Sequence, residues 1–166
     1  MSTKRDRPAA NAEKSDLHAS AVVIGEAGVL IRGPSGAGKS SLAFSLIAAA
    51  EDAGLFARLV GDDRIGIESR GGRLIAYGHP MIQGKIERRG QGIFEIPFLP
   101  AAVVRLVIGL SGEDEAPPRY PKPDHDHIEL AGVTLPYFPV RQDAAPAGLA
   151  FAVLADPRLR RKLLQV

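Results

Sequence analysis

Residues 33–40, GPSGAGKS, match the pattern G-x-x-x-x-G-K-[ST] at every fixed position. An apolar run at 28–31 precedes them and an amphipathic helical pattern follows, so the segment lies between a predicted strand and a predicted helix. In that context the motif cradles phosphate on backbone N–H groups and the positive end of a helix. The pattern predicts a nucleoside triphosphate site, with a glycine-rich turn that binds nothing as the alternative. It does not distinguish kinases, ATPases, GTPases and switches.

The loop residues have expected roles in binding ATP and Mg²⁺. Lys39 would reach the β- and γ-phosphates, and the Ser40 hydroxyl would hold Mg²⁺, which prefers hard oxygen ligands shared with the nucleotide. Glycines permit a tight turn in which the backbone approaches phosphate closely. The residues expected to contact the nucleotide are Gly33, Pro34, Ser35, Gly36, Ala37, Gly38, Lys39, Ser40 and Ser41.

Composition excludes several classes of protein. The 166 residues suit one domain with its own core. The chain has no cysteine, which excludes disulfides and thiolate metal sites, and it has no run of ~20 apolar residues that could span a bilayer. The net charge is only +2, and the basic clusters at the two ends contain almost no aromatic residue. We therefore expect a cytoplasmic protein that binds neither nucleic acid nor membrane.

The hydrophobic pattern predicts an α/β fold, a single P-loop nucleotide-binding domain with a mixed central sheet and a peripheral hairpin. We expect a disordered tail over 1–16, the catalytic domain over 17–166 and a mobile acidic loop over 111–126. The segment 85–92 packs charges and glycines and is expected to be a functional loop. Strands are predicted at 19–24, 28–31, 56–60, 65–68, 73–77, 103–110, 128–130 and 133–140, and helices at 39–53 and 147–155.

Two adjacent carboxylates, Asp62 and Asp63, follow the strand predicted at 56–60. Strand, phosphate loop, helix and strand form a predicted βαβ unit, whose strands end at the same edge of the sheet. We therefore expect both aspartates beside the phosphate loop. One would serve Mg²⁺ and the other would accept a proton from an attacking hydroxyl. The alternative is a metal-binding aspartate with a solvated neighbour.

Other charged residues are candidates with structural alternatives. Glu87 could complete a magnesium shell and Arg89 could neutralise phosphate, or the two could form a surface salt bridge. His18 could lie near the phosphates or be a structural histidine. The cluster at 125–127, His-Asp-His, is not expected to bind metal, because adjacent side chains in a flexible loop rarely converge.

Together these residues resemble HPr kinase/phosphorylase, a bacterial enzyme that acts on a serine of the phosphocarrier protein HPr. His18 precedes the phosphate loop as the family's histidine does, and LVGDDR at 59–64 matches its leucine-valine-small-Asp-Asp-Arg segment. ERRGQGI at 87–93 matches the signature E-I-R-G-L-G-I in part, and PVR at 139–141 matches a later motif. By this resemblance we expect the short proteobacterial form, without the N-terminal domain of longer members.

The resemblance implies phosphorylation of a serine on HPr or an HPr-like protein, and phosphorolysis in which inorganic phosphate releases pyrophosphate. It also implies a homo-oligomer, by family a hexamer. Another P-loop kinase acting on a small molecule, or a nucleotide-regulated binding module, are the alternatives. By resemblance the catalytic residues are His18, Lys39, Asp63 and Arg119, with Arg141 as the alternative arginine, and the Mg²⁺ ligands are Ser40 and Glu87 with Asp62 beside them.

Overall fold

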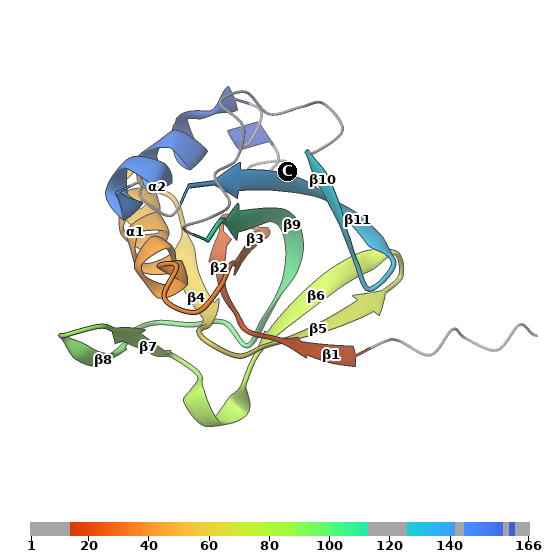
Figure 1. Cartoon of the computed structure of the whole chain (residues 1–166), viewed down its shortest axis with the longest axis horizontal. Helices are drawn as coiled ribbons and strands as arrows, with labels where there is room; N and C mark the ends of the chain where they lie inside the picture. Colours follow the sequence, from red (N-terminus) through yellow and green to blue (C-terminus); the bar gives the residue numbers. More distant parts are fainter. Residues whose placement is uncertain (1–13, 113–125, 142–144, 158–159, 162–166) are drawn as a thin grey trace, which may run out of the picture.

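In the computed structural model the described residues are 14–112, 126–141, 145–157 and 160–161 (Figure 1). Nine strands form one curled sheet, and a separate two-stranded sheet, β7 (Lys85–Arg88) and β8 (Gly92–Glu95), projects from it. The helices are α1 (Lys39–Asp52), α2 (Pro146–Ala155) and the short 3-10 helix η1 (Pro80–Ile82). The nine strands are β1 (Lys14–Leu17), β2 (Ala19–Ile24), β3 (Ala27–Arg32), β4 (Ala57–Gly61), β5 (Ile65–Arg70), β6 (Arg73–Gly78), β9 (Ala101–Leu110), β10 (His127–Leu130) and β11 (Val133–Val140).

Strand β9 organises the sheet because it pairs with three others. One edge runs parallel to β3, while the other pairs antiparallel with β6 near its start and parallel with β11 near its end. The order β1-β5-β6-β9-β3-β2-β4 therefore has β10 and β11 as a branch. This change of partner along one strand splits the sheet, which curls as Figure 1 shows. The predicted α/β fold with a mixed central sheet is confirmed.

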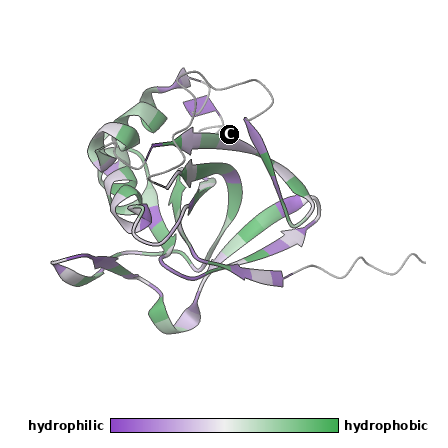
Figure 2. Ribbon diagram, in the orientation of Figure 1, coloured by the Kyte–Doolittle hydropathy of each residue, from purple (hydrophilic) through white to green (hydrophobic). Residues whose placement is uncertain are grey.

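The sheet has an apolar core on each face. Strand β3 is an apolar run: Val29 and Ile31 pack toward α1 and α2, while Leu30 faces the inside of the curl. A strand buried on both faces reads as continuous rather than alternating hydrophobicity. In α1 the buried residues include Leu42 and Leu46, one turn apart. Figure 2 shows apolar residues on the central strands and both helices, and polar residues on β1 and β10.

Helix α1 ends as the sequence predicts. Gly54 follows it with a φ of 76°, in the left-handed region that favours glycine. The N–H groups of Gly54 and Leu55 donate to the carbonyls of Glu51 and Ala50 at 2.9 and 2.8 Å. The last turn is thereby capped and the chain turns back toward β4. None of the described helices is long and apolar enough to cross a membrane.

Three expectations about local structure were wrong. Strand β1 begins at Lys14 and pairs with β5, so the last three residues of the expected disordered tail, 14–16, belong to the sheet; the rest of that tail lies outside the described residues. Strands β3 and β4 are not neighbours, since β2 lies between them and pairs antiparallel with both. The segment 85–92, expected to be a functional loop, contains β7 and the turn to β8, and the two strands form a hairpin outside the main sheet. The peripheral hairpin is therefore β7–β8.

Candidate active site

The phosphate-loop segment connects β3 to α1 at one edge of the sheet. Gly36 and Gly38 have φ values of 79° and 96°, a backbone conformation that other residues adopt at a cost. Gly38 is the N-cap of α1 and offers no side chain to the first N–H groups of the helix. The start of α1 therefore presents backbone donors and the positive end of its dipole to the space above the loop.

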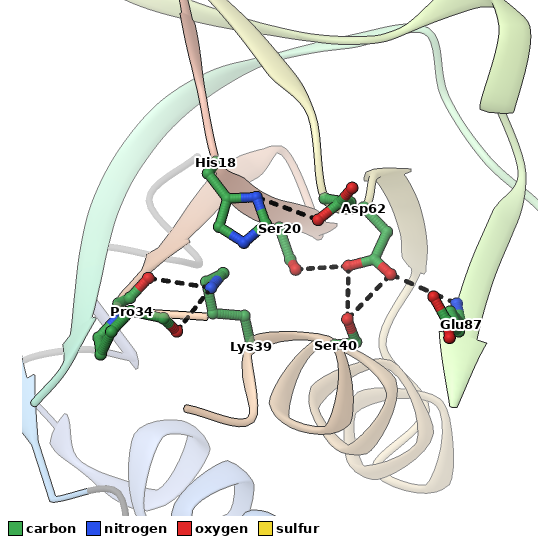
Figure 3. Close-up of polar contacts among 9 residues, drawn as sticks. His18, Ser20, Pro34, Lys39, Ser40, Asp62 and Glu87 are labelled. Atoms are coloured by element: carbon green, nitrogen blue, oxygen red, sulfur yellow. Dashed lines mark hydrogen bonds and ion pairs between the residues drawn. The ribbon is translucent and has the colours of Figure 1, made fainter. Parts of the chain in front are cut away.

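Lys39, the first residue of α1, is bent back over the loop. Its Nζ donates to the carbonyl oxygens of Gly33 and Pro34 at 2.9 Å each, and the residue is only 6% exposed (Figure 3). Burial lowers the pKa of Lys39, although the negative charges of Asp63 and Asp62 act to raise it. The structure thus places a cation between the loop and two carboxylates.

Asp62 follows the last residue of β4 and is 4% exposed. Ser20 Oγ donates to its Oδ1 at 2.5 Å, and Ser40 Oγ lies 2.9 Å from both carboxylate oxygens. The backbone N–H of Glu87 approaches Oδ2 at 3.4 Å. Figure 3 shows this buried carboxylate at the centre of donors from β2, α1 and β7. Asp62 is therefore an acceptor that orients the Ser40 hydroxyl.

Asp63 differs from Asp62 in backbone conformation, exposure and contacts. It has a φ of 65°, the left-handed conformation that aspartate tolerates better than most residues. Its side chain is 72% exposed, and its Oδ1 lies 3.0 Å from His18 Nδ1. The turned backbone points the adjacent carboxylates in different directions, one into the structure and one to solvent. His18 and Asp63, 45 positions apart, form a polar pair at the rim of the site.

These side chains surround one cavity of about 260 Å³. From the loop and α1 it is lined by Ser35, Gly36, Gly38, Lys39, Ser40 and Ser41. From strands β2 and β7 and the connections next to β2, β4 and β7 it is lined by His18, Ser20, Asp62, Asp63, Glu87 and Arg89. Most of the residues predicted for nucleotide, metal and catalysis therefore lie together. Arg119, the expected catalytic arginine, and most of the predicted mobile loop lie outside the described residues.

The hairpin β7–β8 brings Glu87 and Arg89 to the cavity. The guanidinium of Arg88 lies 4.5 Å from the ring centre of Phe44 on α1, and Phe94 of β8 lies 6.3 Å from the same ring in a tilted arrangement. A cation over an aromatic face and a tilted ring pair are both attractive. These contacts fasten the hairpin to α1, so its charged residues face the loop instead of solvent alone.

The donor set suits magnesium shared with a nucleotide. Ser40, Asp62 and Glu87 supply a hydroxyl and carboxylates beside the loop. Among the described residues, no three histidine, aspartate or glutamate side chains converge to hold a metal by themselves. Mg²⁺ usually takes one or two protein oxygens and completes its shell with water and phosphate. In the cluster at 125–127, His127 Nδ1 lies 2.5 Å from Asp126 Oδ1, and His125 is outside the described residues.

The sequence model of one protein family, described as the HPr Serine kinase C-terminal domain, matches residues 9–141 of this chain. The chain belongs to this family. The HPr kinase/phosphorylase of Neisseria meningitidis is 32% identical over 93% of this chain and 49% of its own length. That of Mycoplasma mycoides is 43% identical over 49% of this chain and 24% of its own length. The chain thus spans about half the length of the Neisseria relative, and its match covers a smaller share of the Mycoplasma relative.

A solved structure gives the same relationship for the fold. The Hpr(Ser) kinase/phosphatase from Coxiella burnetii matches with a TM-score of 0.71 and 26% identity, over 89% of this chain and 99% of that one. The family resemblance predicted from the sequence and the mixed, curled sheet are therefore both confirmed.

Not every residue of the motifs shared with the family lines the cavity. Arg64, third in Asp-Asp-Arg, donates from Nε and Nη2 to Asp16 Oδ2 at 3.1 and 2.8 Å, and so ties β1 to the turn after β4. Ser20, by contrast, lines the cavity and was missed by sequence reasoning. The available signal was weak: a lone hydroxyl in the apolar segment ASAVVI, two positions after His18.

Proposed function

We propose that this chain binds ATP with Mg²⁺ and transfers the γ-phosphoryl group to a serine of HPr or an HPr-like protein, and that it also catalyses the reverse phosphorolysis. The observation that carries the proposal is the convergence of Lys39, the Ser40–Asp62 pair and the His18–Asp63 pair on one cavity. The names of the curated relatives support the same activity.

In this proposal the loop and Lys39 hold the phosphates. The N–H groups at the start of α1 face the phosphate oxygens, and the ammonium of Lys39 leaves the carbonyls of Gly33 and Pro34 for the β- and γ-phosphates. Lys39 is well suited to this because its burial strengthens each electrostatic contact. As negative charge shifts among the phosphate oxygens during transfer, a preplaced cation stabilises the transition state.

Ser40, Asp62 and Glu87 would hold the magnesium ion. Ser40 donates its proton to Asp62, which leaves the lone pairs of its oxygen directed at the cavity. Held by these residues, Mg²⁺ would supply positive charge that offsets the negative charge of the phosphates. Arg89, on the turn after β7, is placed to add a second positive charge. The catalytic arginine would be either Arg119, which lies outside the described residues, or Arg141, which directly follows β11.

Asp63 would accept the proton of the attacking serine hydroxyl. Its side chain is 72% exposed, so a serine on another protein could reach it, whereas Asp62 is buried. His18 donates from Nδ1 and holds the carboxylate toward the cavity. In phosphorolysis an oxygen of inorganic phosphate forms a bond to phosphorus, the bond from phosphorus to the serine oxygen breaks, and that oxygen takes the proton from Asp63. Pyrophosphate is the product, and one residue acts as base and acid in turn.

The test is incubation of the full chain with γ-labelled ATP, Mg²⁺ and a purified HPr-like protein. Label on a protein serine, released as pyrophosphate when inorganic phosphate is added, supports the proposal. Label on a metabolite supports a small-molecule kinase instead, and binding without transfer supports a nucleotide-regulated module.

The hexamer, the cytoplasmic location and the division at residue 16 stay predictions. Light scattering of the full chain measures the first of these directly.

A further inference from the structure

We propose that Ser20 is a positioning residue: its buried hydroxyl holds the Asp62 carboxylate in the orientation from which Ser40 can bind magnesium. The inference rests on the magnesium site of the proposed function. Ser20 is 0% exposed, and its Oγ donates to Asp62 Oδ1 at 2.5 Å across 42 positions of sequence. In Figure 3 it approaches Asp62 from the side opposite to Glu87.

Burial makes this hydroxyl conspicuous. Every other residue of β2 is apolar and buried, and a buried hydroxyl is costly unless it forms a hydrogen bond. Among the described residues the buried polar or charged ones are Ser20, Lys39, Asp62 and Glu68. Three of these four line the same cavity. A polar group placed in a central strand beside two residues of the proposed nucleotide site indicates a role in that site.

The strand geometry explains how Ser20 reaches Asp62. Strand β2 pairs antiparallel with β4, and the register shifts between Ala21 and Val22. Such irregularities redirect side chains and occur often near active sites. Ala21 lies opposite Gly61, the last residue of β4, so the residue before Ala21 lies beside the residue after Gly61. The sheet thus places Ser20 next to Asp62.

Counting hydrogen bonds shows what Ser20 contributes. The Ser40 hydroxyl has one proton, and its oxygen can face a metal only while that proton goes to Asp62. Asp62 Oδ1 also accepts from Ser20, and the remaining donor, the N–H of Glu87, is long at 3.4 Å and weak. Ser20 therefore supplies the strongest contact from outside the loop. Without it, the carboxylate can turn and the Ser40 hydroxyl loses its fixed direction.

The experiment compares ADP binding by calorimetry in excess chelator and in excess Mg²⁺. The dissociation constant in chelator divided by the one in Mg²⁺ measures how strongly the metal strengthens ADP binding, because binding without metal reports the loop alone. We call this ratio the metal coupling. Residues that orient metal ligands typically contribute about 10- to 100-fold to metal affinity, so in Ser20→Ala this ratio is expected to fall by that factor, or to one. Affinity for ADP without metal is expected to stay near wild type.

Two variants separate positioning from a purely structural role. Ser20→Thr keeps a hydroxyl on the same carbon and is expected to keep most of the coupling. Val22→Ala is the matched control, since Val22 is also 0% exposed, lies two positions along β2 on the same face, and has no hydrogen bond to Asp62. It is expected to lower the melting temperature and leave the coupling unchanged. Ser20→Cys, with a weak donor of similar shape, serves if the alanine variant does not fold.

Full metal coupling in a folded Ser20→Ala, or in Ser20→Cys, would overturn the inference. So would a wild-type chain whose affinity for ADP does not depend on Mg²⁺, because no magnesium site would then exist to be ordered. A third outcome separates the two proposals: the wild-type chain shows metal coupling, Ser20→Ala reduces it, and the wild-type chain phosphorylates no HPr-like protein. This result supports the role of Ser20 and refutes only the proposed function.

Discussion

Substitution of Asp63 by asparagine separates proton transfer from the fold and from MgATP binding. Asparagine has nearly the same shape and also tolerates the φ of 65° found here, so the backbone turn is expected to survive. The side chain is 72% exposed and contacts His18, whose Nδ1 can donate to an amide oxygen as it does to the carboxylate. Stability and MgATP affinity are therefore expected to change little.

The expected loss is in catalysis. A positioned acid or base contributes about 10²- to 10⁴-fold, so both the kinase and the phosphorolysis rates are expected to fall by that factor, equivalent to about 3 to 5 kcal/mol of transition-state stabilisation. A second effect concerns Lys39, because the Asp63 charge acts to raise its pKa while burial lowers it. Removing that charge lowers the pKa of Lys39 further. The alkaline limb of the pH–rate profile should therefore move to lower pH.

The assay measures both reaction rates and MgATP affinity by calorimetry for Asp63→Asn, with Asp62→Asn as the control. Asp62 is 4% exposed and accepts from Ser20 and Ser40, so its amide would break the magnesium site and weaken MgATP binding. If Asp63→Asn loses MgATP affinity and recovers with raised Mg²⁺ or with Mn²⁺, Asp63 is a metal ligand. If it loses only the kinase direction, the shared acid and base is refuted.

Three further predictions follow from single contacts. Lys39→Ala is expected to reduce transfer by about 10²- to 10³-fold with little change of melting temperature, and activity within a few-fold of wild type would contradict the enzyme assignment. The hydrogen bond from Arg70 lowers the pKa of Glu68 below its ordinary 4.5, so its stabilisation is present above that pH and is lost as pH falls through the lowered value. The melting temperature of Glu68→Gln should therefore fall less than that of the wild type as the pH is lowered. The same dependence of melting temperature on pH in both proteins would refute this prediction. Arg88→Ala removes the cation over Phe44, worth about 0.5 to 1 kcal/mol at an exposed site, and should raise hydrogen exchange in β7 and β8. Unchanged protection there would show that the ring contact of Phe94 suffices.

Much of the fold was predictable where the signal is local. The phosphate-loop motif, the apolar run before it and the spacing of Leu42 and Leu46 predicted strand, loop and helix correctly. Gly54 marked the end of α1, and the position of Asp62 and Asp63 after a strand predicted that they lie beside the loop. The loop, the helix and its end are each produced by residues within a few positions of one another, whereas the placement of the aspartates also depends on how the strands are arranged.

The inference about the aspartates reached the right place by a partly wrong route. The βαβ unit was expected to contain adjacent parallel strands, but β2 lies between β3 and β4. Because β2 is antiparallel to both, β3 and β4 still point the same way, so their ends share one edge. The placement of Asp62 therefore depends on strand direction and not on adjacency.

The sequence by itself determined the phosphate loop, its flanking strand and helix, and the set of charged residues available to it. Only the tertiary structure decided that Ser20 contacts Asp62, that Asp63 turns toward His18, and that β1 pairs with β5. Turn chemistry and hydrophobic period act between neighbours in the chain, so a single segment encodes them. Contacts across 42 positions depend instead on strand order and register, which arise only when distant segments compete for the same sheet edges and the same core.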